Sequence, residues 1–392
     1  MNILYINEDN VGAGSSKALL NYANGMTSRG HNVSVIIKKG EGFFINELKK
    51  TKAKVYLCDF SLAYYPTSHN PIKWLFRILT MNARGYLLSR KISSVIKIDN
   101  IDIVHTNLGP LPFALFPCKK NNIPHVWHHR EFFDKWNKGL HYFPSRNTFF
   151  KQINSKGNYN ICITHTVMDY LGLKENQRNR IIYDGIIGKD DLDVPEATPK
   201  DKYFFYGGGF DENKSPDILI RAFIKFRNRH PDYKLKMAGI YNRENAYYKY
   251  CISLIQDSQM KGNIELLGYR RDIRNLMSHA SAIVVTSIFE GFGFVLVEGM
   301  LNKTVVIGNN TTGTREQFDI GLKQTGKEIG LRFSNEDELV SQLTYVVEND
   351  THSICQNAFS VVCKNYTIDR CVTETEEFYN HVLTHYNSNT YE

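Results

Sequence analysis

The segment Phe289-Glu-Gly-Phe-Gly-Phe-Val-Leu-Val-Glu-Gly-Met300 follows a short run of apolar and β-branched residues that begins at Ala282. A continuous apolar run of this length, bounded by turn-forming residues, is typical of a buried parallel strand. The two glycines that come next open a turn, and the sequence from Val295 to Leu301 continues as a helix. The segment therefore predicts a strand, a glycine-containing turn and a helix, which together form the repeating unit of a doubly wound α/β domain.

The two glutamates of this segment occupy positions at which α/β proteins contact ligands. Glu290 follows the predicted strand, where parallel sheets place ligand-binding residues. Glu298 falls about one turn into the predicted helix and points back toward the ligand side, where a carboxylate can accept hydrogen bonds from two neighbouring ribose hydroxyls. Between them, the N–H groups and the dipole of the helix N-terminus favour an anion. The alternative is an ordinary strand-to-helix turn with two solvated carboxylates.

Length and composition place the chain among globular proteins of two domains. It has 392 residues, of which 42% are apolar and 22% are charged, so long disordered segments are not expected. Its seven cysteines are scattered and form no Cys-x-x-Cys pair, which favours reduced thiols in a cytosolic protein over a zinc site or a disulfide framework. The first residues predict a strand and no signal peptide. No apolar run approaches the roughly 18 residues of a membrane-spanning helix.

Strands and helices alternate along both halves of the sequence. In the first half, the expected strands span residues 2–6, 32–37, 54–58, 101–105, 125–128, 159–163 and 180–182, with a helix at 16–29. In the second half, they span residues 203–206, 234–238, 264–267, 282–285 and 305–308, with helices at 217–229, 244–259, 273–279 and 295–301. A polar, proline-containing stretch at 187–202 predicts the interdomain linker. We therefore expect domains at 1–190 and 200–367, followed by a C-terminal helix within 368–392.

The spacing of Glu290 and Glu298 resembles the E-x7-E signature of the retaining GT-B glycosyltransferases of glycosyltransferase family 4. The resemblance implies an α/β fold of GT-B architecture, in which two Rossmann-like domains face a central cleft. It also implies that the C-terminal helix crosses back to the N-terminal domain. Glu290 would then lie by the donor sugar, and Glu298 would bind the nucleotide ribose. The backbone amides that would face the sugar and the diphosphate are those of Gly291, Phe292, Gly293 and Phe294.

A second segment, Phe204-Phe-Tyr-Gly-Gly-Gly-Phe-Asp-Glu-Asn-Lys-Ser-Pro216, is similar to the part of the family that contacts the diphosphate. Glycines after a strand let the backbone approach a ligand closely, which indicates Gly208 and Gly209 as donor-binding positions. Lys214 precedes a predicted helix and can neutralise a diphosphate as a point charge. The resemblance implies the same contact for Lys214.

One departure from the family pattern affects this part of the site. The family usually has an arginine where this chain has Gly209. A charged hydrogen bond of that kind is worth about 1.5–3 kcal/mol. We expect a substitute charge from Arg271 or the adjacent Arg270, which follow a neighbouring strand, although plain surface solvation is the alternative for both. Without a substitute, either the donor site is weakened or the chain is a non-catalytic partner that binds nucleotide sugars.

A third segment, Pro124-His-Val-Trp-His-His-Arg-Glu-Phe-Phe133, resembles the strand end at which the family carries a histidine near the donor sugar and the acceptor. His128 matches best, and His129 is the alternative if the register shifts by one residue. Because side chains alternate between the faces of a strand, only one of the two can serve. Arg130 and Glu131 are expected either to pair with each other or to shape the acceptor site.

Two smaller features support the same comparison. The loop after the first strand, with Gly12 and Gly14, corresponds to the family's glycine loop near the acceptor and the diphosphate. This loop lacks a full dinucleotide fingerprint, which disfavours a nicotinamide-dependent oxidoreductase. The stretch from Ile181 to Ile186 resembles the family's Asn-Gly turn, with Asp184 in place of the asparagine.

The net charge of the chain is +8, and residues 60–98 contain six basic residues and no acidic one. Arg77, Arg84 and Lys91 recur every seven residues and share one face of an expected helix. A neighbouring stripe of that helix is apolar: Trp74, Ile78, Met81, Leu88 and Ile92. A basic amphipathic helix over 73–92 favours contact with an anionic membrane surface. The alternative is a surface helix whose apolar stripe packs on the protein's own core. No nucleic-acid-binding motif accompanies the charge.

These features together predict a retaining glycosyltransferase that moves a hexose from a UDP- or GDP-linked donor to a saccharide or lipid-linked acceptor in surface polysaccharide synthesis. The expected catalytic residues are His128, Glu290 and Lys214. Lys214, the backbone amides and the helix dipole would stabilise the charge that gathers on the departing diphosphate. Neither a metal ion nor a cofactor is therefore expected. We expect the protein in the cytoplasm or at the inner face of the plasma membrane.

Overall fold

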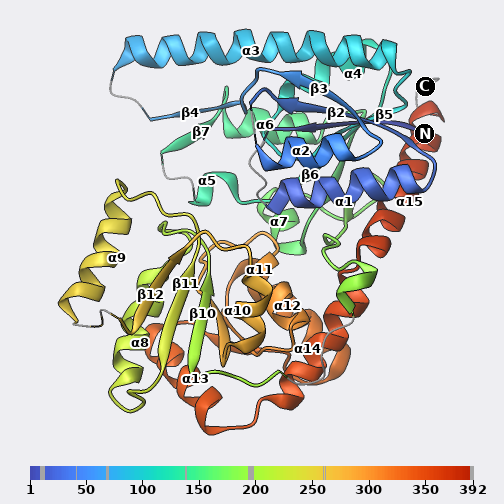
Figure 1. Ribbon diagram of the computed structural model, residues 1–392. Helices are drawn as coiled ribbons and strands as arrows, with labels where there is room; N and C mark the ends of the chain where they lie inside the picture. The colour runs from blue at the N-terminus through green and yellow to red at the C-terminus, as the bar shows by residue number, and fades with distance from the viewer. Residues whose placement is uncertain are drawn as a thin grey trace. The chain divides into compact units, whose positions relative to one another are not determined.

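The computed structural model of the chain describes residues 1–8, 14–40, 42–67, 70–136, 139–192, 198–258, 260 and 262–388. The chain forms two compact units: unit 1 is Met1–Ile186 with Tyr366–Glu392, and unit 2 is Ile187–Asn365. Each unit is built on a parallel sheet covered by helices (Figure 1). The expected fold class is therefore confirmed. No helix in the described part of the chain combines the length and apolar character needed to cross a bilayer.

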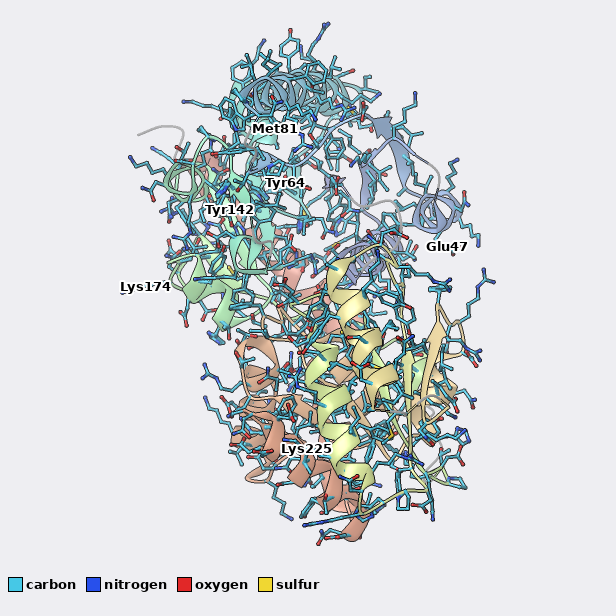
Figure 2. All side chains as sticks on the ribbon, turned by 90° about the vertical axis from the view of Figure 1, so that its left-hand side faces the viewer. Glu47, Tyr64, Met81, Tyr142, Lys174 and Lys225 are labelled. Carbon is cyan, nitrogen blue, oxygen red and sulfur yellow. The ribbon has the colours of Figure 1, made fainter. Side chains whose placement is uncertain are left out.

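The sheet of unit 1 has seven strands in the order β3-β2-β1-β5-β6-β8-β9. Apolar residues fill β1 and β2 because strands of a parallel sheet are buried on both faces. The strands are β1 (Asn2–Asn7), β2 (Asn32–Lys38), β3 (Lys54–Cys58), β5 (Ile103–Thr106), β6 (His125–His129), β8 (Asn158–Cys162) and β9 (Asn179–Ile181). The strand pair β4 (Tyr64–Pro66) and β7 (Leu140–Tyr142), which the sequence did not indicate, is antiparallel and pairs Tyr64 with Tyr142, both labelled in Figure 2.

Helices cover both faces of this sheet. The long helix α3 (Pro71–Ile98) lies on one face and α1 (Gly14–Ser28) on the other (Figure 1). The remaining helical segments are α2 (Phe43–Lys50), the 3₁₀ turn η1 (Pro112–Ala114), α4 (Leu115–Lys120), α5 (Phe133–Trp136), α6 (Arg146–Ile153) and α7 (His165–Tyr170). Four residues of the stripe predicted on α3, namely Ile78, Met81, Leu88 and Ile92, are buried. That stripe therefore packs on the core of the unit, and the hypothesis that it contacts a membrane is wrong for these four residues.

The C-terminal helix α15 (Ile368–Ser388) belongs to unit 1 and packs along α1. Arg29, at the end of α1, pairs with Glu376 at 2.7 Å and with Asp369 at 2.8 Å. Deeper in the unit, the Tyr379 hydroxyl lies 2.5 Å from His105 Nδ1. The last helix of the chain thus completes the core of the first unit.

Unit 2 contains a six-stranded parallel sheet in the order β12-β11-β10-β13-β14-β15. Its strands are β10 (Tyr203–Gly207), β11 (Lys234–Ala238), β12 (Ile264–Gly268), β13 (Ala282–Val285), β14 (Val306–Asn309) and β15 (Leu331–Phe333). Its helical segments are η2 (Lys189–Leu192), α8 (Pro216–Arg227), α9 (Ala246–Asp257), α10 (Ile273–His279), α11 (Phe294–Leu301), α12 (Thr312–Thr325), α13 (Glu336–Glu348) and α14 (His352–Asn365). The strand order reverses between β10 and β13, where doubly wound sheets bind ligands.

Unit 1 is expected to lose stability as the pH falls below about 6.5. Burial lowers the pKa of four histidines: well below the usual range for His105 and His128, and to about 4 for His125 and His129. These rings stay neutral in the folded unit while the unfolded chain takes up protons, so the stabilisation present above about pH 6.5 is lost as the pH falls toward about 4. All three tryptophans belong to unit 1, so their emission during urea unfolding reports this unit.

Between about pH 6.5 and about pH 5 the four histidines dominate, because most carboxylates titrate lower. Glu131 is the exception: burial and Glu8 raise its pKa to about 7, so in the folded unit it takes up a proton in this window and offsets part of the loss. Hydrogen bonding to Arg29 and His31 lowers the pKa of Glu376, so this group loses its contribution only under more acidic conditions.

Asn160 Oδ1 accepts from His129 Nε2 at 2.9 Å. Replacing His129 by Gln keeps a polar group opposite this oxygen and should weaken the pH dependence. A urea midpoint that does not change within this window would contradict the prediction.

Candidate functional site

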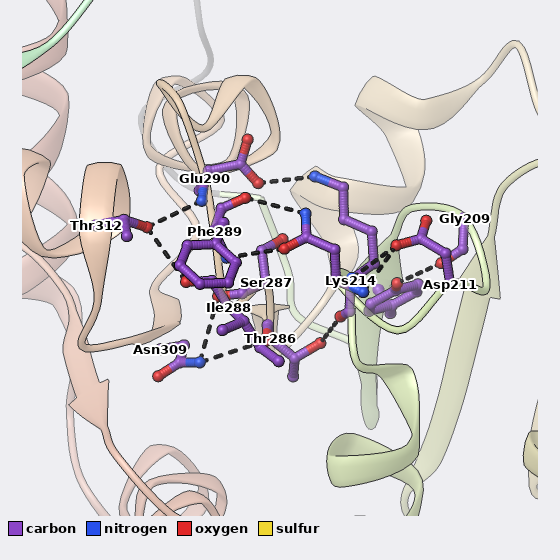
Figure 3. Close-up of polar contacts among 12 residues, drawn as sticks. Gly209, Asp211, Lys214, Thr286, Ser287, Ile288, Phe289, Glu290, Asn309 and Thr312 are labelled. Atoms are coloured by element: carbon purple, nitrogen blue, oxygen red, sulfur yellow. Dashed lines mark hydrogen bonds and ion pairs between the residues drawn. The ribbon is translucent and has the colours of Figure 1, made fainter. Parts of the chain in front are cut away.

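The candidate site consists of two loops of unit 2 that leave adjacent strands at the point where the strand order reverses. One loop, residues 208–215, follows β10, and the other, residues 286–293, follows β13. Because the two strands are parallel neighbours, their loops leave the same edge of the sheet side by side. Figure 3 shows hydrogen bonds and an ion pair that join the two loops.

Asn213 joins the loops with a pair of hydrogen bonds that imitates a β-ladder. Its Oδ1 accepts from the Phe289 N–H at 2.9 Å, and its Nδ2 donates to the Phe289 carbonyl at 3.0 Å. The backbone carbonyl of Asn213 accepts from the Ile288 N–H at 2.8 Å. Within its own loop, Asp211 Oδ1 accepts from the N–H groups of Asn213 and Lys214, both at 3.0 Å. These bonds hold Lys214 opposite the residue that follows Phe289.

That residue is Glu290, and it forms an ion pair with Lys214 in which Nζ lies 2.8 Å from Oε2. The two side chains keep 34% and 16% of their surface exposed, so the pair is partly open to solvent. Burial by itself would lower the pKa of Lys214, but the carboxylate of Glu290 outweighs it and raises this pKa. The ammonium group therefore stays charged at neutral pH. The structure brings these two predicted site residues into direct contact.

The backbone of Glu290 is bonded on both sides to the first turn of α12. Thr312 Oγ1 accepts from the Glu290 N–H at 2.9 Å, and the Gly313 N–H donates to the Glu290 carbonyl at 2.9 Å. Only glycine allows this approach, because a Cβ at position 313 would lie 2.5 Å from the same carbonyl oxygen. Glu290 is therefore held by β13, by Lys214 and by α12 together.

The helix expected after the glycines is present as α11. Gly293 precedes it with a φ of 93°, a left-handed conformation that favours glycine. The first intrahelical bond runs from the Val297 N–H to the Gly293 carbonyl at 3.1 Å, so the N–H groups of residues 294–296 have no partner within the helix. Glu298 lies in the second turn of α11 and is half-buried. Phe292 is 2% exposed, so any ligand contact there would come from its backbone.

The glycines after β10 lie in the expected loop. The Gly208 N–H donates to the Ala238 carbonyl at 2.9 Å, and a Cβ on Gly239 would lie 1.9 Å from the Gly208 carbonyl oxygen. Gly209 lies next to an acidic side chain, since its Cβ would be 3.3 Å from Asp211 Oδ2. The position at which the family usually has a positive charge therefore borders a carboxylate.

The two arginines proposed as substitutes are both exposed. Arg270 forms a two-pronged ion pair with Asp272, with hydrogen bonds of 2.8 and 2.5 Å. Arg271 is exposed at the start of the turn before α10. The contacts of the described residues do not join either arginine to the Lys214–Glu290 pair, and the donor-binding role of Arg271 stays a prediction.

The site residues predicted at Gly12, Gly14 and His128 belong to unit 1, whereas Lys214 and Glu290 belong to unit 2. Gly12 lies outside the described residues, and Gly14 is the first residue of α1. His128 is fully buried, and Arg130 Nη2 donates to its Nδ1 at 3.2 Å. Because an arginine can only donate, the proton of the neutral ring lies on Nε2, which has no hydrogen-bond partner among the described residues. His129 points to the other face of β6, toward Asn160, as the alternation of a strand requires.

Arg130 pairs with Asp184, so the predicted pairing of Arg130 with Glu131 is wrong. Arg130 and Asp184 are 4% and 0% exposed, and Arg130 Nε also donates to the Asn107 carbonyl at 3.1 Å. A buried guanidinium requires a carboxylate, which explains why this chain has Asp184 where the family has an asparagine. Burial and the nearby Glu8 raise the pKa of Glu131, at the end of β6, to about 7.

Two residues that organise the site were missed by the sequence analysis. Asn213 directly precedes Lys214, and Thr312 precedes Gly313 at the start of α12. Their partners are 76 and 22 residues away in the sequence, so no local pattern reveals them. An amide residue beside a predicted ligand-binding residue is the signal that could have identified Asn213; Thr312 has no such neighbour.

Two family models match most of this chain. A model described as "Glycosyl transferases group 1" matches residues 189–358, and one described as "Glycosyltransferase Family 4" matches residues 12–187. A protein of Campylobacter jejuni, N-acetylgalactosamine-N,N'-diacetylbacillosaminyl-diphospho-undecaprenol 4-alpha-N-acetylgalactosaminyltransferase, is 26% identical over 204 residues. That match spans 50% of this chain and 50% of the C. jejuni protein, so the chain spans about half the length of this curated relative.

Solved structures share the fold over nearly the whole chain. A glycosyltransferase from Rickettsia africae superposes with a TM-score of 0.75 at 21% identity, covering 97% of this chain and 98% of that one. HepE of Anabaena, solved in complex with UDP, has a TM-score of 0.74 at 17% identity and covers 96% and 99% of the two chains.

Replacing Asn213 by Ala should destabilise unit 2 by about 2 kcal/mol, because it leaves the Phe289 N–H and carbonyl without their partner in a partly buried loop. Urea unfolding followed by far-UV circular dichroism measures the change. The matched control is Asn242→Ala, which removes an exposed hydrogen bond to the Glu244 N–H and should cost at most about 0.5 kcal/mol. Equal effects of the two substitutions would contradict the bridging role of Asn213.

Proposed function

This chain belongs to the group 1 and family 4 glycosyltransferases, and on that premise we propose that it transfers a hexose from a nucleotide diphosphate donor with retention of configuration. The observation that carries the proposal is the Lys214–Glu290 pair, held at the switch point of unit 2 beside the N-terminus of α11. An ammonium group, a helix N-terminus and carboxylates at one sheet edge suit a ligand that combines phosphates with hydroxyl groups.

Each group has a distinct proposed role. Lys214 and the N–H groups at the start of α11 would bind the diphosphate and stabilise the negative charge that it gains on leaving. Glu290 would accept hydrogen bonds from sugar hydroxyls, and Glu298 from the two ribose hydroxyls. Once the diphosphate draws the ammonium group of Lys214 toward itself, the carboxylate of Glu290 is released from its ion pair to receive the sugar. These groups would act without a divalent ion or a cofactor.

The acceptor would attack from the face that the diphosphate leaves, and a phosphate oxygen would take its proton. We propose His128 as a contact of the sugar or of the acceptor, acting through the proton on Nε2. Glu131, whose pKa is raised to about 7, would help to position the acceptor. The backbone of Gly14, the first residue of α1, would lie near the acceptor and the diphosphate.

The acceptor class is proposed from the relatives. The name of the C. jejuni protein describes transfer to a sugar carried on diphospho-undecaprenol, and HepE was solved with UDP. These names favour a UDP-linked donor, with GDP as the alternative, and a saccharide or lipid-linked acceptor in the synthesis of a surface polysaccharide. An acceptor of this kind would place the protein in the cytoplasm, at the inner face of the plasma membrane.

A second function is favoured by one observation. Gly209 replaces the usual arginine and lies beside Asp211, so the described site offers Lys214 as its cation, and Glu290 already neutralises that cation. This balance suits a non-catalytic subunit that binds a nucleotide sugar without turning it over. Thermal shifts with a panel of nucleotide sugars identify the donor in either case. A transfer assay with that donor then separates an enzyme from a binding subunit, and the anomeric configuration of the product tests retention.

Glu298→Ala should weaken donor binding by about tenfold or more, because a hydrogen bond to a charged group contributes about 1.5–3 kcal/mol. Calorimetric titration with the donor found in the thermal-shift panel measures this change. The control is Glu348→Ala on α13, where the glutamate side chain is 60% exposed and only 3.9 Å from His230, and its donor affinity should match the parent chain. Unchanged affinity in Glu298→Ala would refute the assignment of the ribose contact.

A further inference from the structure

The outward face of α3 carries large apolar side chains that contact no core. Ile72, Leu75, Phe76, Leu79, Tyr86 and Leu87 are between 52% and 79% exposed. On a helix that advances about 100° per residue, these six side chains fall within roughly 120° of the circumference, opposite the stripe that packs on the sheet. Figure 2 labels Met81, a member of the packed stripe, just below α3, on the side that faces the rest of unit 1. The helix is thus apolar on two opposite faces, of which unit 1 covers one.

Positive charge accompanies this outward apolar face: Lys73 and Arg77 lie beyond one edge of it, and Arg90 and Lys97 continue its line toward the C-terminal end of α3. Between residues 60 and 98 there is no acidic residue, and Lys73, Arg77, Arg90 and Lys97 are exposed. The other two basic residues of the helix have partners within the unit: Arg84 pairs with Asp59 at 3.1 Å, and Lys91 lies over the ring of Tyr56 at 4.8 Å. Four cations therefore remain on the exposed surface of α3 without an ion pair among the described residues.

We propose that this face of α3 is an interfacial membrane helix that lies in the plane of an anionic bilayer. An exposed apolar helix face accompanied by lysine and arginine is the pattern that inserts between headgroups while its cations bind lipid phosphates. The helix has 28 residues and is about 42 Å long, which allows contacts along a wide strip of lipid. Two aromatic residues of this outward face suit a bilayer surface: Tyr86 the depth of the headgroups, and Phe76 the apolar layer beneath them.

Charge favours a bilayer over a second copy of this chain as the occupant. In a symmetric dimer through this face, the exposed cations of one helix would meet an identical helix that has no acidic residue, and like charges repel. An anionic lipid surface instead complements all four exposed cations. The use of this attachment rests on the proposed function, because a membrane-bound protein would be close to a lipid-linked acceptor.

The test is co-sedimentation of the full chain with vesicles made of equal parts phosphatidylcholine and phosphatidylglycerol, compared with vesicles of phosphatidylcholine alone. We expect binding to the anionic vesicles, weak binding to the neutral ones, and loss of binding as salt is raised. The double substitution Phe76→Asp with Leu79→Asp should reduce the partition coefficient by about tenfold or more. The matched control is Leu322→Asp on α12, a leucine that is 40% exposed in unit 2, which should bind like the parent chain.

Several outcomes would overturn the proposal: no binding by the parent chain, equal binding to the two kinds of vesicle, or equal binding by the double variant. A parent chain that is dimeric in sedimentation velocity and becomes monomeric in the double variant would assign the face to a second copy. Tryptophan emission during unfolding checks that unit 1 of the double variant is intact. Donor titration of the same variant should match the parent chain, so failure of membrane binding and failure of the proposed function give different results.

Discussion

The reversal of strand order between β10 and β13 is the constraint on which the candidate site depends. Parallel strands must be joined by crossovers, and at this point the crossovers leave to opposite sides, so the two loops remain next to each other without a helix between them. Asn213 converts this proximity into a defined register by bonding both polar groups of the Phe289 backbone. The positions of Lys214 and Glu290 follow from that register, because each is the next residue in its loop.

The charge balance of the site follows from the same arrangement. A carboxylate that is 16% exposed needs a partner, and Lys214 supplies it at 2.8 Å. The N-terminus of α11 adds positive potential without adding a side chain, because Gly293 turns the backbone so that its N–H groups point out of the helix start. When a nucleotide sugar binds, Lys214 would pair with the diphosphate, and Glu290 would accept hydrogen bonds from sugar hydroxyls in place of its ion pair. This exchange is the physical basis of the proposed transfer.

Unit 1 depends on a different interaction, a polar cluster sealed inside its core. Arg130 and Asp184 neutralise each other there, and the cluster extends through Tyr22 to Cys371 Sγ at 2.9 Å. Cys371 belongs to α15, so the end of the chain completes the core of a unit that is otherwise built from its first 186 residues. Gly185 permits this approach, since a Cβ there would lie 2.5 Å from the Thr367 carbonyl oxygen and the Ile368 Cα. The outward face of α3 lies on the other side of the same sheet (Figure 1).

The class of the fold, most of its strands and the strand–turn–helix that contains residues 289–300 were readable in the sequence, because strand and helix periodicities and glycine turns are local properties. The partners of the polar residues were not readable. Arg130 was expected beside Glu131 or at the acceptor, but its carboxylate partner is Asp184, brought there by the pairing of β6, β8 and β9. The two faces of α3 show the same limit. Periodicity identified an apolar stripe on this helix, but only packing against the sheet decided that Ile78 and Met81 are core while Phe76 and Leu79 face outward. A one-dimensional pattern records that residues share a face, and the tertiary structure alone decides what that face meets.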